Sequence, residues 1–189
     1  MSPFFYMVFT RIYRILLQIH NYIETFPYYD VMLIPFNHIF EKHKPVIDGI
    51  IHVGAGDCEE IEEYETHVSR ENILWINPGS ESVTFCKNLY PGIQIECANA
   101  GASKISDLVY RNDVPFNFLT LDLQGFEIQV LDGLGELLTL IDYVYVEISS
   151  VEMMLELDTY LKKFQLSNAE TKWWDCGTWA DVFYARSIR

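Results

Sequence analysis

The sequence predicts an α/β fold: a mostly parallel sheet with helices on both faces and an antiparallel hairpin at its C-terminal edge. Three observations predict it. Short apolar runs alternate with helical patterns between residues 50 and 164, an order that implies right-handed crossovers and a parallel sheet. The first run ends at Gly54 and Gly56, as at a junction of strand, turn and helix. Two last strand-like segments are close enough in sequence to pair antiparallel.

Each element follows from its residue pattern. The apolar runs expected to form strands are residues 50–53, 73–76, 93–97, 116–121 and 143–148, and the closing hairpin is expected from residues 169–174 and 179–185. The segments expected to form helices are residues 57–68, 80–89, 104–110, 126–138 and 151–164. We expect Asp57 to cap the first helix, because an aspartate side chain accepts hydrogen bonds from the unpaired amides there.

Length and composition indicate one domain. A chain of 189 residues, half of them apolar, can bury one substantial core. The one break in composition is at residues 25–45, where Pro27, Pro35 and Pro45 interrupt an aromatic-rich run and indicate a connector. We therefore divide the chain into an N-terminal amphipathic helix with its connector, residues 1–45, and a main domain, residues 46–189.

The N-terminal segment, residues 4–23, is long enough to span a bilayer, but Arg11 and Arg14 fall near its middle. With Gln18 and Asn21 these arginines form one polar stripe opposite a wide apolar face. We expect an amphipathic helix packed on its own domain, on a second copy of the chain or on a partner protein. Attachment to a membrane surface is the alternative.

The charge of the chain is acidic. The formal net charge is −14, and residues 1–48 balance four Lys/Arg against four Asp/Glu, so the acidic excess lies downstream. An acidic body repels phosphate backbones, and we therefore expect no nucleic acid as partner.

The spacing of the cysteines and histidines indicates neither structural disulfides nor a metal site. Cys58, Cys86, Cys97 and Cys176 form no C-x-x-C pair, which favours reduced thiols and a cytoplasmic location, with one disulfide as the alternative. The histidines are scattered along the chain, so no metal site is expected.

Ligands of an open parallel sheet bind outside the carboxyl ends of its strands. The residues that follow the expected strands are Gly54, Ala55, Gly56, Asp57, Asn77, Asn99, Asp122, Gln124 and Glu147. A lone G-x-G turn is compatible with any nucleotide fold. Here Asp57, Glu59 and Glu60 follow it, and their carboxylates would repel a pyrophosphate but attract the sulfonium and ammonium groups of S-adenosylmethionine. The alternative is that these acidic residues only favour a helix start.

Asn77 stands where nucleotide folds usually keep an acidic residue for the ribose hydroxyls. Its amide oxygen can accept a hydroxyl hydrogen bond, although not a charge-assisted one. We expect this to weaken cofactor binding, and we expect Asn77→Asp to tighten it.

The segment NFLTLDLQGFE, residues 117–127, is the most distinctive in the chain. Together with VLDG at 130–133, IDYVYVE at 141–147, ETKWW at 170–174 and WAD at 179–181, it resembles the FkbM family of methyltransferases. VGA at 53–55 and CEE at 58–60 add to the likeness, which covers residues 46–185. The resemblance implies a class I methyltransferase (Rossmann-like) fold, S-adenosylmethionine as cofactor, and O-methylation of a hydroxyl on a sugar or small metabolite.

The chain departs from the family pattern at Gly56, Asn77 and Ala180, and its loops after residues 97 and 147 look short, which indicates trimmed substrate loops. We expect Asp122 to act as cofactor ligand or base and Glu147 as a second catalytic carboxylate. The residues expected to bind the cofactor are Gly54, Ala55, Gly56, Asp57, Asn77, Asn99, Asp122 and Gln124. A degenerate methyltransferase-fold protein that acts as a structural or interaction module is the alternative. A dehydrogenase is disfavoured, because a third phosphate-loop glycine is missing.

Overall fold

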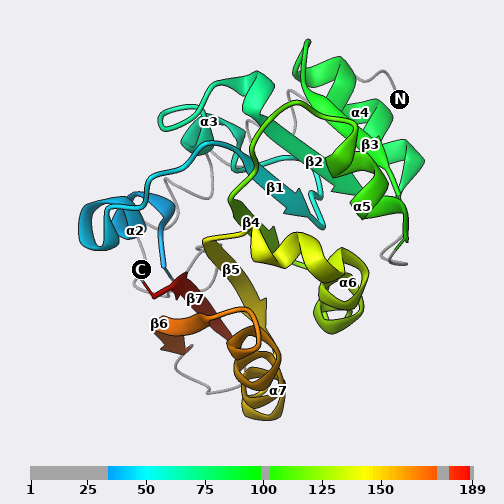
Figure 1. Ribbon diagram of the computed structural model, residues 1–189. Helices are drawn as coiled ribbons and strands as arrows, with labels where there is room; N and C mark the ends of the chain where they lie inside the picture. The colour runs from blue at the N-terminus through cyan, green and yellow to red at the C-terminus, as the bar shows by residue number, and fades with distance from the viewer. Residues whose placement is uncertain (1–33, 99–102, 174–178, 188–189) are drawn as a thin grey trace, which may run out of the picture. The chain divides into compact units, whose positions relative to one another are not determined.

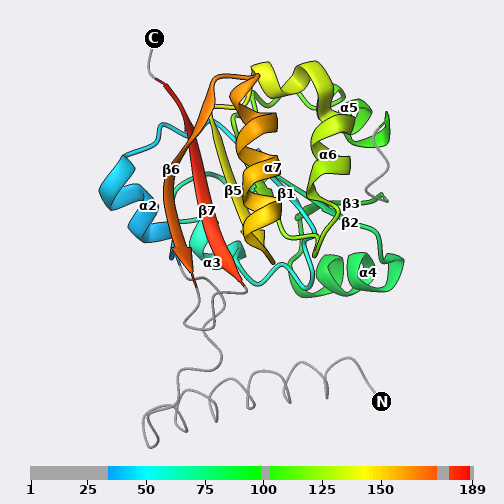
Figure 2. The same cartoon turned by 90° about the horizontal axis from the view of Figure 1, so that it is seen from below.

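The computed structural model describes residues 34–98, 103–173 and 179–187. In this part of the chain a seven-stranded sheet lies between two layers of helices (Figure 1, Figure 2). The N-terminal segment of residues 4–23, together with Asn99, Trp174 and Cys176, lies outside the described residues.

The strands follow one another in the order β3-β2-β1-β4-β5-β7-β6 across the sheet. They are β1 (Ile50–Val53), β2 (Ile73–Asn77), β3 (Gln94–Cys97), β4 (Phe118–Leu121), β5 (Tyr143–Ile148), β6 (Leu166–Trp173) and β7 (Ala180–Arg186). The first five strands are parallel, and β7 runs antiparallel to both β5 and β6. The carboxyl ends of β1, β2, β3, β4 and β5 therefore open at one edge of the sheet.

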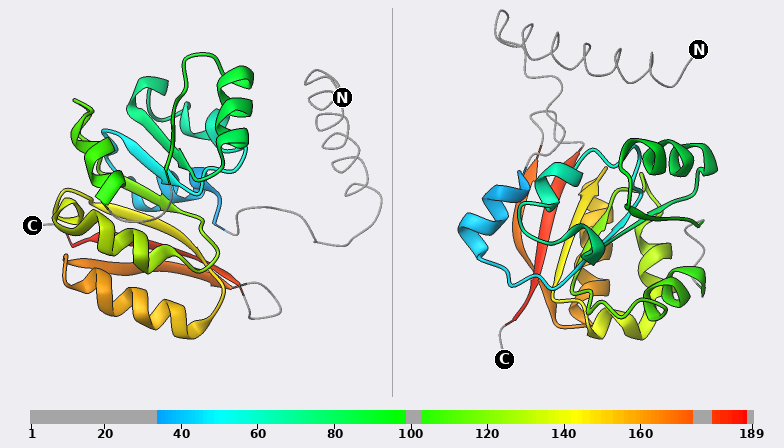
Figure 3. Two further views of the ribbon diagram at one scale, coloured as in Figure 1. Left: turned by 90° about the vertical axis from the view of Figure 1, so that its right-hand side faces the viewer. Right: turned by 90° about the horizontal axis from the view of Figure 1, so that it is seen from above.

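The helices divide between the two faces. They are α2 (Phe36–His43), α3 (Ile61–Tyr64), α4 (Ser80–Leu89), α5 (Ser103–Tyr110), α6 (Glu127–Leu134) and α7 (Val151–Lys162), with short 3-10 turns η1 (Arg70–Asn72) and η2 (Gly135–Thr139). In Figure 2 and in the right panel of Figure 3, α6 and α7 lie on the opposite side of the sheet from α2 and α3. None of the helices in the described part of the chain is long and apolar enough to cross a membrane.

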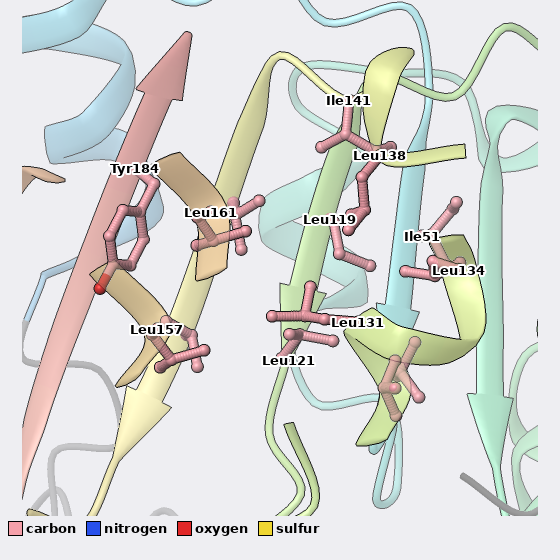
Figure 4. Close-up of a cluster of buried hydrophobic side chains, with 14 of the residues drawn as sticks. Ile51, Leu119, Leu121, Leu131, Leu134, Leu138, Ile141, Leu157, Leu161 and Tyr184 are labelled. Atoms are coloured by element: carbon pink, nitrogen blue, oxygen red, sulfur yellow. The ribbon is translucent and has the colours of Figure 1, made fainter. Parts of the chain in front are cut away.

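Alternation along the strands supplies a core on each face, because successive side chains of a strand point to opposite sides. On one face Leu119 and Leu121 of β4 meet Leu131 and Leu134 of α6, and Tyr184 of β7 meets Leu157 and Leu161 of α7 (Figure 4). On the other face the core comes from Ile50, Trp75, Phe118 and Phe183 of the sheet with Phe36, Ile61 and Tyr64 of the helices. Both faces of the central strands are covered, as parallel sheets require.

The expected fold is confirmed, including the antiparallel edge. Strands β1 and β5 and helix α4 span the residues expected for them. The prediction of a helix over residues 57–68 was wrong in its extent, because α3 covers only Ile61–Tyr64 and begins after Glu60, not Asp57. Left-handed backbone at Gly56 (φ 46°) and Cys58 (φ 58°) keeps this stretch in a turn. The helix expected over residues 126–138 likewise breaks at Gly135 (φ 51°).

Residues 36–43, expected to be part of a connector, form helix α2. Its side chains Phe36 and Ile39 are fully buried in the core of the sheet. The helix is tied to β6 by Glu170, whose carboxylate lies 3.0 Å from His38 Nε2, 3.0 Å from Lys42 Nζ and 2.7 Å from His43 Nε2. The segment is thus packed on the sheet as the helices of the main domain are.

Candidate functional site

The turn after β1 is fixed to its neighbours by backbone contacts. The amides of Gly54 and Ala55 donate to the Ile76 carbonyl at 2.9 and 3.2 Å, and the Asp122 amide donates to Val53 at 3.0 Å. A Cβ at Gly54 (φ 97°) would lie 1.8 Å from the Asp122 carbonyl oxygen. Only glycine therefore lets the turns after β1 and β4 lie against each other.

The surface of this turn presents bare backbone. A Cβ at Gly56 would meet no atom within 4 Å. Gly56 and Asp57 are both exposed, whereas Ala55 and Cys58 on either side are buried. The main chain of the turn is therefore accessible to a ligand, and Asp57 supplies a carboxylate beside it.

Asn77, at the end of β2, is used to hold the turn in place. Its Nδ2 donates to the Gly56 carbonyl at 3.1 Å, and its Oδ1 accepts from the Gly79 amide at 2.8 Å before α4. The side chain is 7% exposed. The predicted ribose contact would therefore have to share an amide that already joins β2, the turn and the start of α4.

The loop after β4 is organised by a buried carboxylate, Glu127, which is not among the site residues predicted from the sequence. Glu127 is fully buried, and its Oε1 accepts from the amides of Leu123 and Gly125, both at 3.2 Å, while Oε2 accepts from Gly125 at 3.0 Å. The exposed Gln124 sits between them in left-handed backbone (φ 50°). Glu127 thus sets the path of the loop that carries Asp122 and Gln124.

Three carboxylates come together at the ends of β4, β5 and β7. Leu121 pairs with Val146, so Asp122 and Glu147 take the next places on neighbouring parallel strands, and Glu147 pairs directly with Asp181. Burial raises the pKa of Glu147 to about 7, and the charges of Asp122 and Asp181 add to this rise. Burial also raises the pKa of Asp122. With a pKa of about 7, Glu147 can hold or release a proton near neutral pH.

Asp181 differs from the other two carboxylates because protein groups surround it. It is 2% exposed, and its Oδ2 accepts from the Ile34 amide at 2.9 Å and from the Tyr145 hydroxyl in a short hydrogen bond. Asp181 was noted above only as part of a sequence motif. It is better described as a buried charge beside Glu147 than as a group that reaches a ligand.

A polar network lies inside the sheet under the same edge. The Tyr64 hydroxyl is 3.1 Å from His52 Nδ1 and 3.1 Å from Thr120 Oγ1. Burial lowers the pKa of His52 to about 4, so its ring is neutral at physiological pH. Its ring also stacks on Trp75, with centroids 4.9 Å apart. The network joins β1, β4 and α3 below the candidate site.

The structure brings most of the predicted site residues to one edge. Those that lie there are Gly54, Ala55, Gly56, Asp57, Asn77, Asp122, Gln124 and Glu147. Asn99 lies outside the described residues. Glu127, Asp181 and the Tyr64 network were missed, because only the fold brings their partners together. Within the described ranges no group of three or more His, Cys, Asp or Glu side chains is placed to hold a metal ion, and the absence of a metal site stays a prediction.

No family model matches the chain, and no curated protein matches it. Solved structures do. A TehB-like SAM-dependent methyltransferase from Corynebacterium glutamicum is similar over 98% of this chain and 100% of its own, with a TM-score of 0.59 and 9% identity. A candidate tRNA (m1A22) methyltransferase from Streptococcus pneumoniae is similar over 75% and 65%, with a TM-score of 0.52 and 14% identity. TrmK of M. capricolum, solved with S-adenosylhomocysteine, is similar over 74% and 62%, with a TM-score of 0.50 and 9% identity.

These likenesses correct one expectation. The acidic charge led us to expect no nucleic acid as partner, but similar structures include a protein described as a tRNA methyltransferase. Net charge reports the average field of a chain and does not describe the local surface beside a site. The prediction that nucleic acid is not a partner, which rested on net charge alone, was therefore wrong.

Identity at this level shows the fold alone. This chain, with its antiparallel β7 and helices on both faces of the sheet, is similar in structure to the methyltransferases named above, two of which are described with S-adenosylmethionine or its product. The chain has a class I methyltransferase, Rossmann-like fold.

Proposed function

We propose that this chain is an S-adenosylmethionine-dependent methyltransferase, related to the FkbM family, that methylates a hydroxyl of a sugar or small metabolite. The observation that carries the proposal is the meeting of the Gly54 turn with the loop of Asp122 at the edge of the sheet where β5 carries Glu147. The proposed cofactor turn after β1, Asp122 after β4 and Glu147 of β5 thus lie on three successive strands of the sheet.

The residues present fit this cofactor better than a dinucleotide. The amides of Gly54 and Ala55 donate to Ile76, so they are committed to β2 and not offered to a phosphate. The side chain at the rim of the turn is Asp57, a carboxylate. A sulfonium and an ammonium are attracted to such a rim, whereas a pyrophosphate is repelled. Gly54, Gly56, Asp57, Asp122 and Gln124 would hold the cofactor through main chain and carboxylates.

The bound cofactor supplies an activated methyl group. The protein's part is to position the acceptor in line and to take its proton, and positioning supplies most of the acceleration in such transfers. Glu147 is the base we propose, because its pKa of about 7 lets it take a proton near neutral pH and lose it again. Asp122, with its raised pKa and its place after β4, is proposed to face the cofactor.

One observation favours the second candidate, a methyltransferase-fold protein that no longer turns over. Both polar atoms of the Asn77 amide already bond to the protein, at Gly56 and Gly79. A position that usually anchors a ribose is here part of the scaffold. This candidate shares the fold and differs in cofactor binding. The cytoplasmic location is a further proposal, which rests on the scattered cysteines of the sequence.

The test is methyl transfer from labelled S-adenosylmethionine to three acceptor sets: sugars and their glycosides, phenolic and aliphatic alcohols, and RNA. The proposal expects a labelled methyl ether on the first or second set, and its loss in Glu147→Gln but not in Glu152→Gln, an exposed carboxylate at the start of α7. Label on a base of the RNA would mean that the acceptor is RNA and not a sugar or small metabolite. A chain that does not bind the cofactor at all would favour the second candidate, a methyltransferase-fold protein that no longer turns over.

A further inference from the structure

Two cysteines far apart in sequence meet beside the Gly54 turn. The Sγ atoms of Cys58 and Cys86 lie 3.2 Å apart, although 28 residues separate them. Both side chains are fully buried. Cys58 ends the turn after β1 and Cys86 lies within α4, so the contact joins the turn to the helix that follows β2.

We propose that Cys58 and Cys86 are a redox pair, and that their oxidation to a disulfide displaces the turn and weakens cofactor binding. The effect on the cofactor rests on the proposed function, whereas formation of the disulfide does not.

The hydrogen-bond order assigns a role to each sulfur. The Cys58 thiol donates to the Cys86 sulfur at 3.2 Å, and the Cys86 thiol donates to the Gly56 carbonyl at 3.8 Å. The hydrogen bond from Cys58 lowers the pKa of Cys86, while the pKa of Cys58 itself is raised by the same contact and by burial. The hydrogen bond that Cys58 donates would stabilise a thiolate at Cys86, and the thiolate is the form that reacts with oxidants, so Cys86 is the sulfur proposed to react first.

The chemistry needs a peroxide as oxidant and balances in two steps. The Cys86 thiolate attacks hydrogen peroxide, the O–O bond breaks, and a sulfenic acid and hydroxide form. The Cys58 sulfur then attacks the Cys86 sulfur, the S–O bond breaks, and water leaves with the Cys58 proton. The hydroxide takes up the proton that Cys86 lost on ionising, so that in total two thiols are oxidised and one peroxide is reduced to two waters.

The oxidant can reach the pair through the turn that covers it. Gly56 and Asp57 are exposed, and no atom lies within 4 Å of where a Gly56 Cβ would be. The turn has left-handed backbone at Gly56 and Cys58. Local opening of this turn is enough to admit a small oxidant to the two sulfur atoms.

Closing the bond would move the turn and leave the helix in place. A disulfide has a sulfur separation of about 2.04 Å, so the pair must close by about 1.2 Å from its present 3.2 Å. Cys86 is inside α4 and held by its helical hydrogen bonds, whereas Cys58 is bonded through its amide to Ala55 of the same turn, at 2.7 Å. The displacement therefore falls on Ala55, Gly56 and Asp57, the residues proposed to lie under the cofactor.

The experiment compares the full chain reduced with dithiothreitol and oxidised with hydrogen peroxide. Peptide mapping by mass spectrometry is expected to find one Cys58–Cys86 cross-link that dithiothreitol reverses. Titration calorimetry is expected to show S-adenosylhomocysteine bound about tenfold more weakly after oxidation, equivalent to about 1.4 kcal/mol. Cys97→Ser, which removes an exposed thiol, is the matched control and is expected to respond as the unmodified chain does.

Cys58→Ser and Cys86→Ser are each expected to lose the response. Because either variant could fold poorly, amide hydrogen exchange of residues 54–58 in the unmodified chain supplies a readout that needs neither variant nor cofactor. Faster exchange there after oxidation supports the proposal. A chain that oxidises without the cross-link, or that forms it with unchanged exchange and unchanged affinity, overturns it. If the reduced chain binds no S-adenosylhomocysteine, the proposed cofactor fails, while the cross-link and exchange still decide the redox pair.

Discussion

Glu147 of β5 and Asp181 of β7 lie opposite each other in the antiparallel ladder between these two strands. Asp181 is buried and engaged by Tyr145 and the Ile34 amide, so its charge acts on Glu147 without its reaching a ligand. Burial, Asp122 and Asp181 raise the pKa of Glu147 to about 7. The pairing of β7 with β5 therefore places a charge beside Glu147 and helps to bring the protonation of this carboxyl group near neutral pH.

The first prediction concerns the pH dependence of methyl transfer. If Glu147 is the base, the rate rises as the pH passes through about 7 and the carboxyl loses its proton. Glu147→Gln is expected to reduce kcat by about 10²–10⁴-fold, the usual contribution of a general base, and to leave the Kd for S-adenosylhomocysteine unchanged. A variant that keeps full turnover and the same pH profile would remove Glu147 from this role.

The same pKa predicts how stability depends on pH. Between about 4.5 and about 7 the folded chain holds a proton on Glu147 that the unfolded chain has lost. Bound protons favour the folded state in this window, so the contribution of Glu147 to the free energy of unfolding falls as the pH rises through it. Urea unfolding of the unmodified chain and of Glu147→Gln is the measurement. Their difference is expected to change between these pH values and to be flat above them; a constant difference would contradict the raised pKa.

Asn77→Asp tests the geometry at the end of β2. The sequence alone leads to the expectation of tighter cofactor binding, but the structure predicts weaker binding. Asn77 Nδ2 donates to the Gly56 carbonyl at 3.1 Å, and a carboxylate oxygen there would repel that carbonyl. We expect a loss of about 1–3 kcal/mol in stability and a higher Kd for S-adenosylhomocysteine.

The matched control is Asn72→Asp. Asn72 Nδ2 also donates to a backbone carbonyl, that of Asp48, at 3.1 Å, but at the other end of β2. This control is expected to leave the Kd unchanged. If both variants weaken binding alike, or if Asn77→Asp tightens it, the structural role given to Asn77 is refuted.

Glu127→Ala tests the loop after β4. Removal of the carboxylate leaves the amides of Leu123 and Gly125 without their acceptor, at a cost of up to about 1–3 kcal/mol for the partly buried Leu123 and less for the exposed Gly125. We expect a lower Tm and faster hydrogen exchange at residues 122–126. Glu152→Ala, an acidic residue in the first turn of α7 that is exposed, is the control. Equal effects of the two substitutions would mean that Glu127 only favours its helix.

The sequence was enough to predict the sheet because its signals are local. Residues 50–53 and 143–148 are apolar runs bounded by turn residues, and both form strands over those residues. The helix expected from Asp57 onwards could not be corrected from sequence, because the left-handed backbone at Cys58 is unusual for that residue type. Helix α2 was missed because the prolines around it are the stronger local signal.

The site was predictable only in part, for a related reason. The edge of the sheet follows from strand order, so Gly54, Asp122 and Glu147 could be placed together in advance. Contacts between distant segments could not. The hydrogen bonds of Tyr64 to His52 and Thr120, and the meeting of Cys58 with Cys86, join parts of the chain that no sequence pattern connects.

Titration of the reduced, full-length chain with S-adenosylhomocysteine, and in parallel with NAD⁺, decides whether the Gly54 turn binds the proposed cofactor, on which the proposed methyl transfer depends. We expect saturable binding of S-adenosylhomocysteine with a rise in Tm, as for any ligand that binds only the folded state, and no binding of NAD⁺. No heat of binding and an unchanged Tm at millimolar S-adenosylhomocysteine, or saturable binding of NAD⁺, would contradict this expectation.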